Sequence, residues 1–453
     1  MKRSTATVLL WVLALTLPLG AVLQPWLAPS RSHMPAVPRG LHTPVLLITV
    51  PGLRADRVHH LGYDRETTPN LDRLLRHGVS FTRAYSASND GGATLAALHA
   101  SRHPQLNGVL SSDDVLPEER PTLADKLAPY DYDSLAVLGD PSVVHMGLEQ
   151  GFQQVTALPT GASSDQAFAA ALQFVDETQS PSWFVWVDLP DLLPPYGGDF
   201  ADEQRFAPDM PASFAEEEPF GFISETEQRR RGWGAQERRW LNDRYDGALH
   251  HMDASIGRFL EALDERMALQ TMVVCVTGTR GEEISERPGV LAAHGLDLYE
   301  TSIHVPLIFR LPAQHVRNRL LDEFARTEDV GPTLLQLSLK HGARSQWLGS
   351  CGKSLFDIMV GRREPVSRTY SQGRHSKRSS KLTAAQAMPP LSQAVRADRF
   401  KLIQTLGTGK GVEMYNLSKD PNERSNRSTT QAAVTDALAK FGEDWAAGCG
   451  EEP

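Results

Sequence analysis

The stretch Pro44-Val-Leu-Leu-Ile-Thr-Val50 is a continuous apolar run, rich in β-branched residues and followed at once by Pro51 and Gly52. A strand that is buried on both faces has this pattern, and such strands are typical of parallel sheets covered by helices. Two further runs, 183–187 (Trp-Phe-Val-Trp-Val) and 272–276 (Met-Val-Val-Cys-Val), have the same character. Together the three runs predict the central strands of one large sheet.

Helical patterns alternate with these strands. Thr68-Pro69-Asn70 predicts a helix start, and the leucines at 71, 74 and 75 share one face of that helix before Gly78 ends it. Residues 236–269 carry apolar side chains at helical spacing and predict a long amphipathic helix. Strand–helix alternation over this length predicts an α/β fold with helices on both faces of the sheet.

The composition excludes several classes of protein. The chain has 453 residues, of which 41% are hydrophobic and 22% are charged, as in ordinary globular proteins. Apolar runs recur throughout, which excludes disorder over the whole chain, and only one run approaches the length of a membrane span. The net charge of −9 argues against a general nucleic-acid binder, so we expect no nucleic-acid partner.

The N-terminus has the pattern of an export signal. Lys2 and Arg3 precede an uncharged segment whose most apolar part spans residues 8–23. We predict a signal anchor or signal peptide over residues 1–28, and favour the uncleaved anchor, followed by a Pro-rich linker over residues 29–43. The main domain would then lie outside the cytoplasm, membrane-anchored or secreted. A disulfide between Cys351 and Cys449 is compatible with such an oxidising compartment, but the sequence does not require it.

The remaining sequence divides into two parts. Residues 44–360 are predicted to form the α/β domain, and residues 361–453 a smaller C-terminal subdomain. Residues 199–227 are acidic and residues 362–381 are basic, and both segments are predicted to be exposed loops. Residues 393–403 and 413–417 are predicted to pair as a hairpin of a small C-terminal sheet.

Several stretches together resemble the sulfatase family of the alkaline-phosphatase superfamily. The most specific is 62–74, Gly-Tyr-Asp-Arg-Glu-Thr-Thr-Pro-Asn-Leu-Asp-Arg-Leu, which is similar to the family's opening helix. The other similar stretches, in the same order as in the family, are residues 47–57, 78–85, 101–109, 245–257, 293–309, 399–403 and 413–424. The resemblance covers nearly everything after residue 43. It implies a mixed, mostly parallel sheet flanked by helices, with a small antiparallel C-terminal subdomain.

The resemblance also implies a divalent cation beside a nucleophile, which together hydrolyse sulfate or phosphate esters. This sequence departs from the family's pattern on four separate loops. Where the family has metal ligands, this sequence has Pro51 and Gly52 after the first strand, and Asp188, Thr279 and Arg280 on later loops. Where the family has its nucleophile, this sequence has Gly91. One histidine, His294, matches the family's set. We therefore predict no metal, no cofactor and no catalytic residue at this site. A loop shift would offer Ser88, Asp90 or Thr94 as nucleophile, but no cation would remain to activate it.

Arg280 has two interpretations. A guanidinium binds sulfate or phosphate without a metal, and the free N–H groups of Gly91 and Gly92 at a helix start could complete a metal-free anion pocket. Alternatively, Arg280 pairs with Asp188, Glu282 or Glu283 and fills a cavity that no longer has a catalytic function. We favour the ion pair, because a single arginine in a former metal site is a weak signal.

Three functions follow from these interpretations. The first is a catalytically inactive pseudo-sulfatase of the cell envelope that binds a sulfated or phosphorylated ligand or regulates an active partner protein, anchored to the membrane by its N-terminal segment. The second is an active sulfuric or phosphoric ester hydrolase with a non-standard site. The third is a hydrolase or transferase with a displaced, metal-independent site around His294, His99, His103 and Asp56. We favour the first, because carboxylate ligands are missing from the expected strand ends.

Overall fold

The structure, a computed structural model, describes residues 42–140, 143–194, 196, 205–207, 211, 221–222, 233–267, 269–287, 290–291, 295, 297–312, 318–339, 350–362, 368–374, 391–406 and 411–448. The predicted segment 1–28, His294 and Cys449 lie outside these residues. The domain boundaries and the Cys351–Cys449 bridge therefore stay predictions. None of the described helices combines the length and the apolar character needed to cross a membrane.

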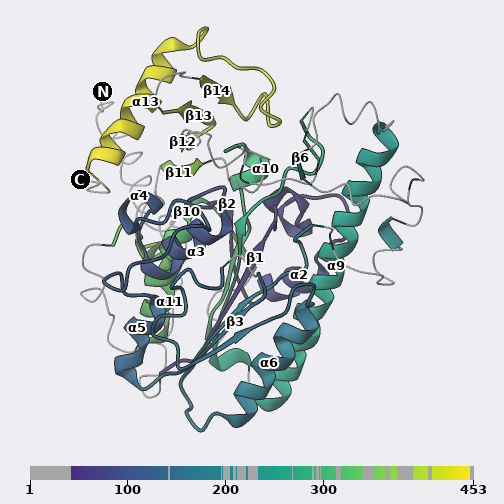
Figure 1. The fold of residues 1–453 in the computed structure, drawn as a ribbon, viewed down its shortest axis with the longest axis vertical. Helices are drawn as coiled ribbons and strands as arrows, with labels where there is room; N and C mark the ends of the chain where they lie inside the picture. The colour runs from purple at the N-terminus through teal and green to yellow at the C-terminus, as the bar shows by residue number, and fades with distance from the viewer. Residues whose placement is uncertain are drawn as a thin grey trace, which may run out of the picture.

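One mixed sheet forms the centre of the molecule (Figure 1), with strands in the order β10-β2-β9-β7-β1-β5-β3-β4. Only β9 runs antiparallel to its neighbours, and the other pairs are parallel, which confirms the expected fold class. The strands are β1 (Val45–Pro51), β2 (Gly78–Tyr85), β3 (Asp133–Leu138), β4 (Gln154–Ala157), β5 (Trp183–Asp188), β7 (Val273–Arg280), β9 (Leu307–Arg310) and β10 (Arg319–Arg326).

Helices cover both faces of this sheet because successive side chains of β1 point to opposite sides. Leu46 and Ile48 pack in one core with α2 (Pro69–Leu75), α6 (Ser164–Glu177) and α9 (Ala235–Arg266). Val45 and Leu47 pack in a second core with α3 (Gly91–Ala100), α5 (Leu123–Leu127) and α11 (Val330–Ser338). All seven residues of β1 are buried, as the apolar run predicts.

The helix α9 holds α2 against the sheet. The carboxylate of Asp253 accepts hydrogen bonds from the backbone N–H groups of Asn70 and Leu71, each at 2.8 Å. A Cβ on Gly257 would lie 2.4 Å from Oδ1 of Asn70, so the close approach of the two helices requires glycine there. The helix ends at Arg266 rather than at the predicted residue 269, since Leu269 begins a 3-10 turn, η5 (Leu269–Thr271).

The C-terminal subdomain contains a second, antiparallel sheet in the order β11-β12-β13-β14. Its elements are β11 (Arg368–Arg374), β12 (Leu391–Ala397), β13 (Phe400–Thr405), β14 (Val412–Asn416) and α13 (Ala432–Gly448). Residues 393–403 were predicted as one arm of a hairpin, but they contain both β12 and β13 and form a hairpin by themselves. The prediction of an exposed basic loop over residues 362–381 is also wrong in part, because residues 368–374 pair with β12 over their whole length.

Aromatic stacking joins this subdomain to the main domain. The ring of Trp445 lies 4.1 Å from that of Tyr370 and 4.4 Å from that of His103. The remaining described elements are short: α4 (Pro104–Asn107), α10 (Glu300–Ile303), α12 (Phe356–Met359), the pair β6 (Gly221–Phe222) and β8 (Val290–Leu291), and the 3-10 turns 55–57, 59–61, 128–130 and 327–329. Cys275, in β7, and Cys351 are both buried.

Candidate functional site

The predicted site residues converge at the start of α3. A Cβ placed on Gly91 would lie 3.2 Å from Oγ1 of Thr279, 3.8 Å from Nε of Arg280 and 3.9 Å from Cβ of Pro51. The register of the sheet explains this meeting, because Pro51 ends β1 opposite Arg280 at the end of β7. Carboxyl ends of parallel strands are where sites form in open α/β sheets.

The turn after β1 is fixed by the sheet and by α9. The backbone N–H of Gly52 donates to the carbonyl of Arg280 at 3.1 Å, and the Tyr245 hydroxyl donates to the carbonyl of Gly52 at 2.6 Å. Gly52 has a φ of +89°, and a Cβ there would lie 2.7 Å from the carbonyl oxygen of Leu192. Glycine is therefore required at a position where the family's pattern has a metal ligand.

Arg280 is buried and forms an ion pair. Its Nη1 lies 2.5 Å from Oε2 of Glu282, and it also donates to the carbonyl of Gly281 at 3.0 Å. The two side chains are 3% and 0% exposed. This geometry favours the ion-pair interpretation of Arg280 over the anion pocket.

A carboxylate already occupies the start of α3. Oδ1 of Asp90 accepts a hydrogen bond from the Ala93 backbone N–H at 3.0 Å and from the Ser112 hydroxyl at 2.7 Å. A Cβ on Gly92 would lie 2.5 Å from Sδ of Met146, so Gly92 is packed closely on its outer side. An external anion would compete with Asp90 for the positive end of the helix.

Asp188 ends β5 beside the same turn and is fully buried. Thr49 Oγ1 donates to its Oδ1 at 2.6 Å. Burial, with a smaller contribution from the nearby Asp140, raises the pKa of Asp188 to about 8. Without a cation beside it, the side chain is therefore mostly protonated at neutral pH.

The described residues do not fit a divalent cation. Among them, no group of three His, Cys, Asp or Glu side chains is placed to hold a metal ion. At the convergence point, Pro51 and the glycines offer no side-chain ligand, Thr279 is uncharged and Arg280 is positive. The absence of a metal from this centre stays a prediction.

The displaced site around His99, His103 and Asp56 is not assembled. His99 packs on Trp186 at 4.2 Å, and burial lowers its pKa to about 3. His103 packs on Tyr370 and Trp445 in a different part of the core. Neither lines the cavity to which Asp56 contributes.

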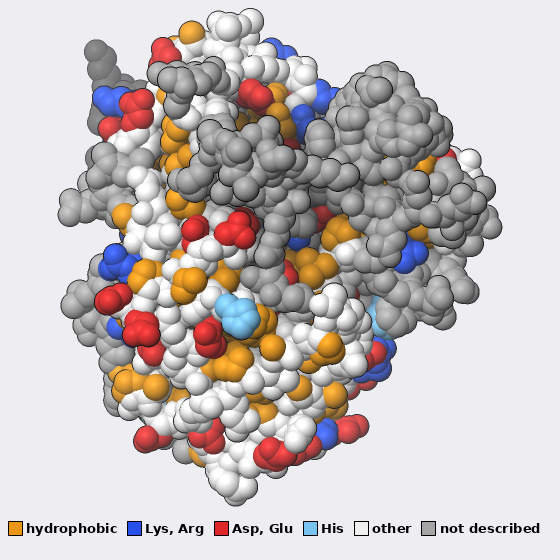
Figure 2. All heavy atoms as spheres, in the orientation of Figure 1, with side chains coloured by type: hydrophobic (Ala, Val, Ile, Leu, Met, Phe, Trp, Pro, Cys, Tyr) orange, Lys and Arg blue, Asp and Glu red, His pale blue; other side chains and the backbone are white. Residues whose placement is uncertain are grey.

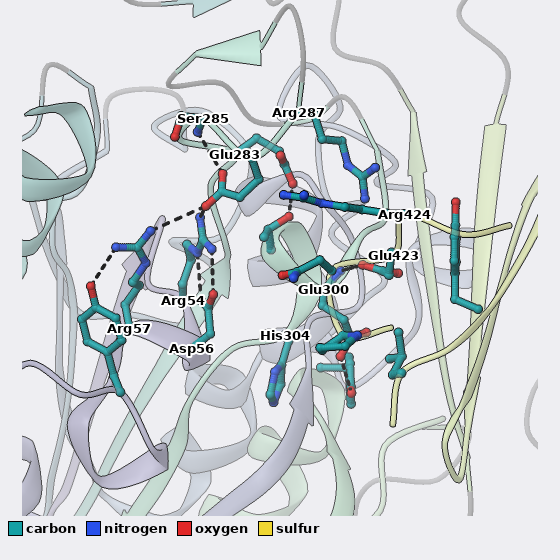
Figure 3. Close-up of a pocket in the computed structure, with 18 of the residues that line it drawn as sticks. Arg54, Asp56, Arg57, Glu283, Ser285, Arg287, Glu300, His304, Glu423 and Arg424 are labelled. Atoms are coloured by element: carbon teal, nitrogen blue, oxygen red, sulfur yellow. Dashed lines mark hydrogen bonds and ion pairs between the residues drawn. The ribbon is translucent and has the colours of Figure 1, made fainter. Parts of the chain in front are cut away.

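A large cavity of about 1430 Å³ lies between the α/β domain and the C-terminal subdomain. Figure 3 shows Arg54, Asp56 and Arg57 on one side of it and Glu300, Glu423 and Arg424 on the other. None of Pro51, Gly52, Gly91, Gly92, Asp188, Thr279 and Arg280 lines it. Its charged lining residues are Arg54, Arg57, Arg83, Arg238, Arg287, Arg396 and Arg424 with Asp56, Glu283, Glu286, Glu300 and Glu423.

The wall formed by the first turn is a network of ion pairs. Arg54 pairs with Asp56 at 2.7 Å and with Glu286 at 2.5 Å, and its Nη1 donates to the carbonyl of Glu282 at 2.9 Å. Although desolvation opposes it, the ion pair with Arg54 lowers the pKa of Asp56 to about 2, and the Asp56 side chain remains about half exposed. The same arginine therefore connects the cavity wall to the Arg280–Glu282 pair behind it.

The opposite wall joins the two domains through a buried lysine. Lys401 is fully buried, and its Nζ lies 2.9 Å from Glu300 and 2.9 Å from Glu423. Between the walls, Glu283 is 1% exposed and accepts a hydrogen bond from Thr301. Burial, together with the neighbouring Asp297, raises the pKa of Glu283 to about 9, so this cavity residue is neutral at pH 7.

Two exposed arginines line the cavity without a carboxylate partner among the described residues. They are Arg238, on α9, and Arg424, after β14. Elsewhere, on the face in Figure 2, acidic and basic side chains of the described residues are interspersed. With Glu283 neutral, the described lining residues include seven arginines against four ionisable carboxylates, and one of these, Glu423, has a pKa raised to about 7. It is suited to an anionic ligand.

The sequence matches two family models. Residues 44–339 match the model described as sulfatase. The chain belongs to the sulfatase family. Residues 296–442 match a second model, described as the C-terminal part of N-sulphoglucosamine sulphohydrolase. The resemblance inferred from the sequence is therefore confirmed. None of the proteins with curated descriptions matches the chain.

Solved structures with this sulfatase-family fold share little sequence with the chain. The phosphonate monoester hydrolase of Agrobacterium radiobacter has a TM-score of 0.72 and 19% identity, over 89% of this chain and 95% of that one. A phosphonate monoester hydrolase from Silicibacter pomeroyi has a TM-score of 0.65 and 18% identity, over 89% and 94%. A 2-O GAG sulfatase has a TM-score of 0.64 and 19% identity, over 90% and 94%. These similarities establish the fold.

Sequence reasoning missed the cavity of this sulfatase-family protein. Arg238 and Arg424 are almost 190 positions apart; Arg238 lies in no stretch that resembles the family, and Arg424 ends such a stretch, 413–424, without a predicted role. Glu283 was considered only as a partner for Arg280, whereas the structure pairs Arg280 with Glu282. The only available signal was indirect: Arg54 and Asp56 lie in 47–57, one of the stretches that resemble the family.

We predict that Arg280→Ala destabilises the protein by about 3–5 kcal/mol, because Glu282 would lose the cation that balances its buried charge. The double variant Arg280→Met with Glu282→Leu should recover most of this loss, since it removes both charges. Urea unfolding with and without sulfate measures the effect. A wild type that sulfate stabilises, together with an Arg280→Ala variant that is as stable as wild type without sulfate, would restore the anion-pocket interpretation.

We also predict a pH-dependent effect of Asp188→Asn. In the folded chain Asp188 keeps its proton up to about pH 8, whereas the unfolded chain releases it near the ordinary value of 3.8. Its contribution to stability is therefore present at low pH and is lost between about pH 4 and 8, by on the order of 1 kcal/mol per pH unit. Relative to wild type, the variant should gain stability as the pH rises from 5 to 9.

Unfolding free energies at pH 5, 7 and 9 measure this difference. The exposed Asp64→Asn is the matched control and should shift little relative to wild type. A constant difference between wild type and Asp188→Asn at all three pH values would contradict the neutral state of Asp188.

Proposed function

We propose that this sulfatase-family chain is catalytically inactive and binds a sulfated or phosphorylated ligand, with its main domain outside the cytoplasm. One observation carries the first part of the proposal. The Arg280–Glu282 pair is buried where Pro51, Gly91 and Thr279 meet, at the position that the family's pattern gives to a cation and its ligands.

Electrostatics oppose a divalent cation at this position. At an effective dielectric constant of 20, a guanidinium about 4 Å away repels a cation by about 4 kcal/mol for each unit of the cation's charge. Glu282 cannot offset this fully, because it already pairs with Arg280. Without a cation, a sulfate or phosphate ester would lack the Lewis acid that polarises it.

The neighbouring hydroxyl groups do not replace the missing nucleophile. Thr94 Oγ1 donates to the carbonyl of Ser88 at 3.1 Å, and the Ser88 hydroxyl accepts from the Asp90 backbone N–H at 3.1 Å. Both side chains are fully buried, so each serves the turn before α3. Catalysis at this centre therefore lacks both the cation and the attacking group.

The ligand part of the proposal rests on the cavity between the two domains. Arg238 and Arg424 are exposed at the cavity, so they can contact an entering anion without first breaking an ion pair to a described residue. Arginine binds sulfate and phosphate oxygens through two parallel N–H groups. A ligand carrying several such groups would satisfy both arginines at once.

Metal analysis and ester hydrolysis of the purified full chain test catalytic inactivity. We expect no stoichiometric divalent cation and no turnover of aryl sulfate, aryl phosphate or aryl phosphonate monoesters, because the centre offers neither a cation site nor a nucleophile. Stoichiometric calcium, magnesium, manganese or zinc, with turnover that disappears on chelation, would overturn the proposal. It would instead establish the ester hydrolase with a non-standard site.

Titration with a heparin hexasaccharide and with inositol hexakisphosphate tests the ligand. Replacing both Arg238 and Arg424 by Gln should weaken binding about tenfold, since an exposed ion pair contributes up to about 1 kcal/mol. Added salt should weaken binding of the wild type. The matched control is Arg258→Gln, which removes an exposed arginine of α9 that does not line the cavity. Equal binding by all three proteins would place the ligand elsewhere.

A further inference from the structure

A second pocket lies on the other side of the molecule from the proposed ligand cavity. It has a volume of about 420 Å³ and is bounded by α2, α9, η5 and the end of β9. Pockets for small molecules commonly have volumes of about 300–1,000 Å³. Arg310 lines it and pairs with Val274 at the start of β7, six residues before Arg280. At about 3.3 Å per strand residue, roughly 20 Å separates this pocket from the Arg280 centre.

Arg310 differs from the other buried arginines of the described chain. Arg54, Arg280, Arg326 and Arg396 each have a carboxylate within 4.0 Å. Arg310 is 6% exposed and has no such partner among the described residues; its Nη1 donates to the backbone carbonyl of Leu269. Burial lowers the pKa of this guanidinium, and Asp264 offsets the effect only in part. A buried cation without a counter-charge is costly, and an anionic ligand would remove that cost.

The other residues that line the pocket indicate which chemical groups a ligand could carry besides its anionic group. Leu74, Leu260 and Leu269 supply apolar walls. Two acids also line the pocket, but both are engaged: Glu261 pairs with Arg73 at 2.6 Å, and Asp264 accepts from the Leu269 backbone N–H at 2.7 Å. Their negative charges would repel an anion with several charges, such as the proposed ligand of the larger cavity. The pocket therefore suits a single negative charge on an apolar body.

We propose that this pocket binds a small organic monocarboxylate, with its carboxylate on the guanidinium of Arg310 and its apolar part between Leu74 and Leu260. Arginine presents a planar pair of donors that matches a carboxylate. The pocket walls are held in place without ligand, since Asp253 fixes α2 to α9 one turn away. This site is independent of the proposed function, because it shares no lining residue with the larger cavity.

Calorimetric titration of the full chain with benzoate tests the proposal. We expect one site on the wild type and on Arg258→Gln, an exposed arginine of α9 outside the pocket. Arg310→Gln should weaken benzoate binding about tenfold or more, because a charge-assisted hydrogen bond is lost. Benzamide, which has the same shape without the charge, should not bind detectably. The Arg238→Gln, Arg424→Gln variant should bind benzoate as the wild type does, which separates this test from that of the larger cavity.

Absence of benzoate binding to the wild type would overturn the proposal, as would equal binding by Arg310→Gln or by benzamide. A second measurement remains decisive if Arg310→Gln does not fold. Crystals of the wild type soaked in 4-bromobenzoate should show an anomalous bromine signal between α2 and α9, with the carboxylate on Arg310. Bromine signals only at other places would assign the binding to another surface.

Discussion

A charge inside a protein must be balanced there, because water is not available to solvate it. In this chain each buried charge is balanced by a residue that is close in space and often distant in the sequence. Lys401 of the C-terminal sheet lies between Glu300 and Glu423, and Arg54 of the first turn holds Asp56 and Glu286. The docking of the two domains and the shape of the cavity between them both depend on these pairs.

The same constraint applies to the centre at the strand ends, where a buried arginine lies at a position that the family's pattern gives to a metal ligand. Carboxylates gathered around a cation repel one another once the cation is gone, so ligands and cation have to be lost together. Here Pro51, Gly52 and Thr279 carry no charge, and the buried cation Arg280 is balanced by Glu282, two residues away. A Cβ on Gly91 would contact Arg280, and the sheet register places Pro51 opposite the same arginine.

The sequence was sufficient for the strands and for the meeting of their ends. An apolar run such as 45–50 can satisfy its backbone only in a covered sheet, and the strand ends of such a sheet necessarily approach one another. The partner of Arg280 could not be predicted, because Asp188, Glu282 and Glu283 are all near it and the choice depends on the path of the backbone at Gly281. The cavity depends on how the C-terminal subdomain docks, and no sequence pattern specifies that docking. Residues 368–374 looked like a basic loop because their neighbours are charged, whereas pairing with β12 makes them a strand.

The chemistry of each ionisable side chain decides whether its buried charge is removed by a change of protonation or balanced by an opposite charge. Asp188 and Glu283 can take up a proton, and both do so at neutral pH because burial raises their pKa values to about 8 and about 9. A guanidinium cannot lose its proton at any ordinary pH, so Arg280 needs the fixed carboxylate of Glu282. Arg310 has no carboxylate within ion-pair distance among the described residues, and the Leu269 carbonyl and the more distant Asp264 supply only part of a counter-charge. For an arginine in that position, an anion from outside the chain is the remaining route to neutrality.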